Sequence, residues 1–211
     1  MKFAILIGHG ESEGGSYDPG AVNGAYHEFR IAREIGKAAC ERLRLAYGAS
    51  CQLVNYDGVF SLSDRIRQFR GKAVDFLAEI HLNAGSGTAS GTEVYYFPGD
   101  QTGKRYAAAV SGAVSAALGI PDRGAKASDY YGIIRQTGPT ACLVETCFIS
   151  SADLDKVKDT AGQVLAGSAI ADGIAKAAGL TLREGFQKIN GKLYFYMDGR
   201  PIITDKDGVI L

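Results

Sequence analysis

The sequence is poor in tryptophan, proline and cysteine. Its 211 residues include no tryptophan, only five prolines and four cysteines. The cysteines are Cys40, Cys51, Cys142 and Cys147, and no two of them form a Cys-x-x-Cys pair. Four cysteines are sparse for a disulfide framework in a chain of this length. We therefore expect buried thiols, and we regard Cys142 and Cys147 as a less favoured source of soft metal ligands.

Net charge and long apolar runs are also lacking. The 23 basic and 23 acidic residues cancel, so no net field attracts the chain to nucleic acid or to a membrane surface. No stretch approaches the roughly 18 apolar residues of a membrane-spanning helix. One lysine precedes a short apolar run near the N-terminus, and no signal-peptide cleavage site follows it. We expect synthesis in the cytoplasm, with no membrane insertion and no nucleic-acid partner.

Strand and helix patterns alternate along residues 1–180. The apolar fraction of 46% is enough to bury a core. Strands are predicted at 3–7, 52–56, 73–84, 92–98, 131–135 and 141–148, and helices at 27–47, 61–72, 102–118 and 151–178. This alternation predicts an α/β domain with a mostly parallel, twisted sheet of about six strands and helices on both faces.

The texture of the sequence changes after Gly179. Turn dipeptides separate short aromatic runs at Asn190-Gly191, Asp198-Gly199 and Asp207-Gly208. Such dipeptides between alternating runs indicate β-hairpins. Residues 185–211 are therefore predicted to form a small β-hairpin or meander, a unit too short to be stable without packing on another surface.

Histidines and acidic residues lie where the predicted strands end. His9 follows the first strand, His81 closes the third, and Glu145 lies near the end of the last. In open α/β sheets the functional crevice lies outside the carboxyl ends of the strands. Glu145 also interrupts an apolar run, and a buried unpaired carboxylate costs several kcal/mol. We expect a positive group to face it.

Two questions stay open at this level. His27 and Glu28 are neighbours at a helix start, where they point about 100° apart. Either three histidines or two histidines and a glutamate therefore face the crevice. In addition, IGHGES (residues 7–12) differs by Gly8 from the Arg-His-Gly-Glu signature of histidine phosphatases. Arg65 is a candidate for the second phosphate-binding arginine of that alternative.

The ordered motifs resemble those of the zinc-dependent N-acetylmuramoyl-L-alanine amidases of the type 3 class. They read ILIGHG (5–10), DPGA (18–21), Glu28, HLNA (81–84) and VETCF (144–148), with GTEVYY (91–96), DRGAK (122–126) and YGIIRQT (131–137) between them. The resemblance covers about residues 2–178. Leu6-Ile7 replaces the aspartate-proline pair that often precedes Gly-His-Gly in that family. Gly8 and the early position of His81 argue against the phosphatase.

The resemblance implies roles for particular residues. His9, Glu28 and His81 would hold one Zn²⁺ ion, and Glu145 would be the catalytic carboxylate. Asn83 is a weaker candidate for substrate contact. The implied reaction is hydrolysis of the amide between N-acetylmuramic acid and L-alanine in peptidoglycan, by water that zinc activates. The implied setting is cell-wall lysis by a phage endolysin, with a host autolysin or sporulation amidase second and an inert wall-binding module third.

The C-terminal stretch also resembles a single cell-wall-binding repeat, without the tryptophans of choline-binding repeats. Wall binding is therefore one expectation for residues 185–211. A structural or homodimer-forming hairpin is somewhat more favoured. In either case Tyr194, Phe195 and Tyr196 are expected to be exposed. The basic helix around Arg65 and Arg67 is expected to present a solvated face rather than to contact anionic wall polymers.

Overall fold

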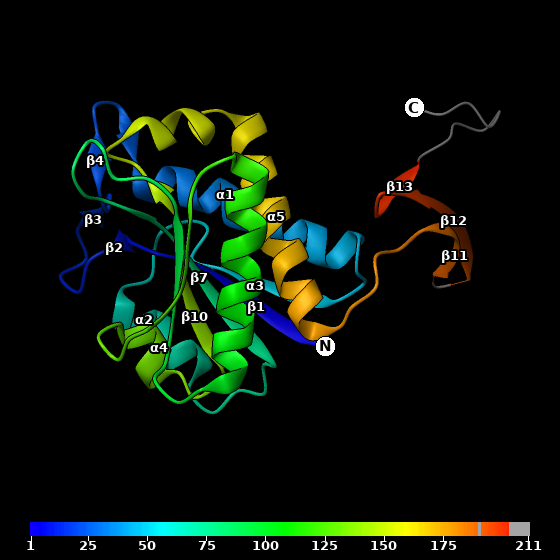
Figure 1. Ribbon diagram of the computed structural model, residues 1–211. Helices are drawn as coiled ribbons and strands as arrows, with labels where there is room; N and C mark the ends of the chain where they lie inside the picture. Colours follow the sequence, from blue (N-terminus) through cyan, green and yellow to red (C-terminus); the bar gives the residue numbers. More distant parts are fainter. Residues whose placement is uncertain (190, 203–211) are drawn as a thin grey trace.

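A six-stranded sheet forms the centre of the molecule, in a computed structural model that describes residues 1–189 and 191–202 (Figure 1). In spatial order the strands are β6 (Ser50–Val54), β1 (Lys2–Ile7), β7 (Phe76–Asn83), β10 (Ala141–Phe148), β8 (Thr92–Tyr96) and β9 (Asp122–Ala127). The first four are parallel, whereas β8 runs antiparallel to β10 and β9 runs parallel to β8. The predicted mostly parallel sheet of about six strands is confirmed.

Helices cover both faces of this sheet. One face packs against α1 (Glu28–Leu45), α3 (Gln101–Leu118) and α5 (Thr160–Ala178), and the other against α2 (Leu62–Phe69) and α4 (Gly132–Gln136). Successive residues of a strand point to opposite faces, so β1 sends Ile5 into the larger core and Leu6 into the smaller one. Among the described residues, none of the helices combines the length and the hydropathy that a membrane span requires.

The segment expected as a strand at 131–135 is the short helix α4. Its backbone makes a helical hydrogen bond from Arg135 N to the Tyr131 carbonyl. The adjacent residues Ile133 and Ile134 both enter the core under α2 and α4, whereas a strand would send them to opposite faces. The sixth strand is instead β9, over the DRGAKA residues.

The single long helix expected at 151–178 is interrupted. A 3-10 helix (Ala152–Lys156) comes first, and α5 starts after Asp159, whose side chain caps Gly162 N at 2.8 Å. Asp153 is buried and accepts hydrogen bonds from Gly91 N and Phe148 N. It therefore ties the loop before β8 to the end of β10.

Small β elements complete the fold. Two hairpins occupy the loop between β1 and α1, formed by β2 (Gly10–Glu11) with β3 (Tyr17–Asp18) and by β4 (Val22–Asn23) with β5 (Tyr26–His27). A three-stranded antiparallel C-terminal sheet consists of β11 (Gly185–Ile189), β12 (Lys192–Met197) and β13 (Arg200–Ile202). The predicted meander is confirmed over these strands. The turn predicted at Asp207-Gly208 lies outside the described residues.

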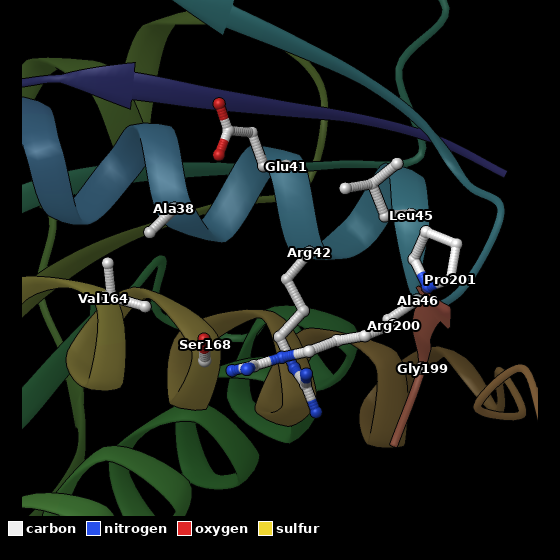
Figure 2. A pocket seen from close by; sticks show the side chains of 10 residues that line it. All are labelled: Ala38, Glu41, Arg42, Leu45, Ala46, Val164, Ser168, Gly199, Arg200 and Pro201. Carbon is white, nitrogen blue, oxygen red and sulfur yellow. The ribbon is translucent and has the colours of Figure 1, made fainter. Parts of the chain in front are cut away.

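The C-terminal sheet packs on the end of α1. A Cβ at Gly199 would lie 2.5 Å from Ala46 Cβ, and a pocket lies between α1, α5 and residues 199–201, where the Arg200 side chain extends toward Ser168 (Figure 2). Tyr196, expected to be exposed, is instead buried beneath the sheet, with 4% of its surface exposed. Tyr194 and Phe195 are exposed as predicted.

Candidate active site

The candidate residues meet at the carboxyl end of the main sheet. Glu145 of β10 is in register with His81 of β7 on one side and with Glu93 of β8 on the other. Residues paired in this way project from the same face, on strands about 4.8 Å apart. That face is the one covered by α2 and α4, because Leu143, two residues before Glu145, belongs to their core. The structure thus places Glu145 beside a candidate metal ligand.

His9, Glu28 and His81 form a group of possible metal ligands in the described part of the chain. One ligand atom from each lies within 4.8 Å of the others. The carboxylate oxygen Glu28 Oε1 lies 2.8 Å from His81 Nδ1 and 3.1 Å from His9 Nε2. The predicted trio is brought together from β7, the start of α1 and the loop after β1. It can hold a metal ion.

The Glu28 carboxylate is fixed on both oxygens. Oε1 accepts a hydrogen bond from Leu82 N and Oε2 accepts one from Ala21 N. Burial by itself raises the pKa of Glu28, but hydrogen bonds to the His81 and His9 rings outweigh it and hold that pKa well below its usual range. For His81, burial lowers the pKa, and the contacts with Glu28 and Glu79 raise it well above the ordinary value. The Glu28 carboxylate is therefore anionic, and its position allows it to bind a cation together with the two histidines.

Two glycines leave the space that the trio occupies. A Cβ at Gly8 would lie 2.2 Å from His81 Cε1. A Cβ at Gly20, which has a positive φ of 68°, would lie 2.6 Å from Glu28 Oε2. The trio thus consists of two imidazoles and one carboxylate, and the two glycines beside it have no side chain to occupy its space. That donor set is the one found in catalytic zinc sites with two histidines and a glutamate, so the residues fit zinc.

The choice between His27 and Glu28 is decided by the helix start. His27 is the last residue before α1, and its Nδ1 lies 3.3 Å from the Tyr17 hydroxyl. Glu28, the first residue of the helix, is 4% exposed and faces the two other ligands. The set of two histidines and one glutamate is therefore the one that forms.

Glu145 is buried and almost without partners. It is 9% exposed, and its Oε2 makes no hydrogen bond with any described residue. Burial raises its pKa to about 7; the nearby carboxylates Glu28 and Glu93 add to that rise, while His81 opposes it. A carboxyl group with a pKa near neutrality can both take and return a proton at physiological pH.

Asn83 is engaged within the protein. Its Nδ2 donates to Glu93 Oε1 at 2.7 Å, and its Oδ1 accepts from Ala84 N. Glu93 also accepts hydrogen bonds from Tyr95, Arg123 and Lys126. Burial raises the pKa of Glu93, but Arg123 and Lys126 bring it down to about 2. Asn83 thus anchors the wall beside Glu145, and its proposed substrate contact stays a prediction.

The cysteines and Arg65 lie in the protein interior and not at the candidate metal or phosphate sites considered for them. All four thiols are free and buried, and Cys142 and Cys147 lie in the core on the face opposite Glu145. Arg65, expected on a solvated helix face, is instead buried and pairs with Glu79, so it is not available to a phosphate. Arg67 on the same helix is exposed as predicted.

Sequence reasoning missed the roles of four residues around the trio. Asp18 accepts from His9 Nδ1 at 2.9 Å, Glu79 lies beside His81, and Asn55 and Arg65 both hydrogen-bond the His9 carbonyl. Glu79 interrupts the apolar run of β7 as Glu145 interrupts that of β10. The argument applied to Glu145 would have found it.

Comparisons with known proteins agree with the geometry. The profile of the N-acetylmuramoyl-L-alanine amidase family matches residues 4–176. N-acetylmuramoyl-L-alanine amidase LytC of Bacillus subtilis is 31% identical over 79% of this chain, which spans only 33% of LytC. The solved catalytic domain of the amidase CwlV of Bacillus (Paenibacillus) polymyxa is 25% identical, with a TM-score of 0.74 over 86% of this chain and all of that domain. The catalytic domain of the CD27L endolysin, which targets Clostridia difficile, is 25% identical, with a TM-score of 0.71 over 83% of this chain and 97% of that domain.

Proposed function

Because the chain belongs to the N-acetylmuramoyl-L-alanine amidase family, we propose that it hydrolyses the amide between the lactyl group of N-acetylmuramic acid and L-alanine in peptidoglycan. The proposal rests on the environment of Glu145. This residue is a buried carboxylate with one unpartnered oxygen, in register with a ligand-type histidine. The chain spans about a third of LytC.

The trio of His9, Glu28 and His81 would hold zinc. When bound, zinc supplies polarisation of the scissile carbonyl and acidification of a water molecule. Each ligand is held by a second contact: Glu28 by Leu82 N, His9 by Asp18, and His81 by Glu79. Such outer contacts set ring orientation and tautomer.

Glu145 would move the proton. It takes a proton from the attacking water as the water oxygen bonds to the carbonyl carbon, and it returns that proton to the departing nitrogen of L-alanine as the carbon–nitrogen bond breaks. The products are a lactyl carboxylate and a free amine. The raised pKa of Glu145 suits both steps, because an acid–base group works best when its pKa is near the working pH.

The products test the proposed reaction. Purified protein is incubated with isolated cell walls, and the new amino groups and new reducing sugar ends are counted separately. We expect free N-terminal L-alanine to appear without reducing ends, activity to disappear on chelation, and activity to return with zinc. New reducing ends would indicate a glycosidase, new amino groups on other residues an endopeptidase, and wall binding without products an inert module.

The biological setting is a separate proposal. We infer an endolysin-like role in cell-wall lysis, supported by the likeness to a solved endolysin catalytic domain; the likeness to LytC supports a host amidase as the second candidate. We expect cells that make the protein to lyse only when a pore-forming protein is co-expressed. Lysis without the pore would count against the proposed cytoplasmic location.

The C-terminal sheet has an exposed apolar face. Phe186 of β11 is 72% exposed and contacts the exposed Phe195 of β12. Wall binding and homodimer formation are both proposals for this face. Phe186→Ser leaves the buried side of the sheet intact, so it should weaken wall co-sedimentation in the first case and halve the mass in solution in the second. No effect on either would leave the sheet with a packing role only.

A further inference from the structure

A buried ion pair lies beneath the candidate metal site. Arg65 of α2 and Glu79 of β7 have side chains that are 6% and 2% exposed, and Arg65 Nε donates to Glu79 Oε1 at 2.9 Å. Removing two charges from water largely offsets their attraction, so such a pair contributes little net stability. Stability alone therefore does not account for this pair.

Glu79 faces the outer nitrogen of a ligand histidine. Its Oε2 lies 3.2 Å from His81 Nε2, whereas Nδ1 of the same ring faces Glu28. This Nε2 is buried and makes no hydrogen bond of good geometry with any described residue, so the Glu79 contact is an ion-pair contact. Asp18 stands in the equivalent place for His9 and accepts from its Nδ1 at 2.9 Å. Each imidazole thus lies between Glu28 and a second carboxylate.

Arg65 also reaches the second ligand histidine. Its Nη1 donates to the backbone carbonyl of His9 at 3.0 Å and to that of Phe60 at 2.8 Å. His9 has a positive φ of 61°, a backbone conformation that is strained for a residue with a side chain. Asn55 Nδ2 donates to the same carbonyl at 2.7 Å. These two donors hold His9 in the strained conformation that directs its ring toward Glu28.

We propose that Arg65 and Glu79 are a positioning pair for the metal centre: Glu79 orients the His81 ring through Nε2, and Arg65 fixes Glu79 and the His9 backbone together. The pair links the two histidine ligands, one from the loop after β1 and one from β7, through one guanidinium group. Neither residue contacts the scissile bond in this proposal. It rests on the zinc site of the proposed function but does not depend on the substrate.

The test separates positioning from packing. Glu79→Gln keeps the size of the side chain and an acceptor for Arg65 but removes the charge that faces His81. In the double variant Arg65→Met with Glu79→Leu, apolar side chains replace the pair, a change that is often neutral or stabilising for a fold. The control is Arg67→Met, on the exposed face of the same helix, where the arginine is 74% exposed.

Two measurements are made on the full chain. Zinc affinity is measured by competition with a chromophoric chelator, and unfolding of the chelator-treated protein is measured by circular dichroism. We expect Glu79→Gln and the double variant to weaken zinc binding roughly 10- to 100-fold, the range for lost outer contacts of metal ligands. The double variant should unfold within a few degrees of the parent, and Arg67→Met should match the parent in both measurements.

A spectroscopic readout adds to these. In protein loaded with Co²⁺, the visible absorption bands report ligand geometry, and we expect Glu79→Gln to shift them while Arg67→Met does not. Zinc affinity of the double variant within threefold of the parent would overturn the proposal, as would loss of affinity only in proportion to loss of folded protein. A parent that binds zinc but cleaves no wall would refute the proposed function and leave this test intact.

Discussion

Replacing Glu145 with glutamine tests the assignment of the general base. The substitution keeps the shape of the side chain and removes its ability to take a proton. General-base catalysis contributes about 10²- to 10⁴-fold to a rate, so kcat for wall hydrolysis should fall by that factor. Zinc content should not change, because Glu145 is not among the three grouped ligands. The assays are release of N-terminal L-alanine and metal analysis of the same sample.

The same variant has an effect on stability with a definite sign. Burial raises the pKa of Glu145 from the ordinary 4.5 to about 7, so between these values the folded protein binds more protons than the unfolded chain. The stability of the metal-free parent therefore falls as pH rises through that window. The difference between the two pKa values corresponds to a loss of roughly 3 kcal/mol of folding free energy above pH 7. Glu145→Gln removes this loss of stability, although burying an unpaired amide cancels part of the gain. We expect the metal-free variant to be more stable than the parent at pH 8, with the difference smaller or reversed at pH 4.5.

Different outcomes refute different parts of this reasoning. A kcat within threefold of the parent would show that Glu145 is not the base. Loss of zinc together with activity would make it a ligand. A stability difference that is the same at pH 4.5 and pH 8 would show that burial does not perturb this carboxyl group.

The remaining predictions concern the metal trio. Glu28→Gln should abolish stoichiometric zinc on metal analysis, because the carboxylate oxygen shared by both rings becomes a neutral amide; full zinc content would contradict the ligand assignment. Gly8→Ala places a Cβ where 2.2 Å separates it from the His81 ring, so zinc affinity should fall at least tenfold, whereas Gly14→Ala, whose nearest contact would be 3.9 Å away, should not change it. Zinc affinity should also rise with pH: burial lowers the pKa of His81, but its carboxylate contacts raise it well above the ordinary value, so protons compete with the metal. Affinity that is flat between about pH 6 and pH 8 would contradict that competition.

Much of the fold could be predicted because its signals are local. The apolar run of β1 and the helical pattern that begins at residue 61 are each read from a few consecutive residues, and β1 and α2 both appear in the structure. The segment at 131–135 could not be read in this way, because a five-residue run with a tyrosine and two isoleucines suits a strand or one helical turn equally. The core under α2 and α4 decides for the helix, since it takes Ile133 and Ile134 together.

The candidate site also contains residues that could be predicted from local sequence and residues whose roles depend on tertiary contacts. His9 and His81 could be predicted from their positions at strand ends, because parallel strands bring their carboxyl ends to one edge of the sheet. In the sequence Glu28 and His27 are equal choices, and the start of α1 at Glu28 decides between them. Glu79 stands out in the sequence because it interrupts an apolar run, but its role, like that of Asp18, depends on the side chains that it faces.

By itself the sequence determined most of the strands and helices, with β9 and α4 the exceptions in the main sheet and its cover. It also determined the types of ligand available and the strand ends at which the two histidines stand. Only the tertiary structure decided which of these side chains meet. The contact between Arg65 and the His9 carbonyl spans 56 residues, and that between His81 and Glu28 spans 53. Packing of helices on the sheet sets contacts at such separations, whereas local sequence preferences act over a few residues. That difference in range is why the ligand residues could be predicted and the roles of the residues that support them could not.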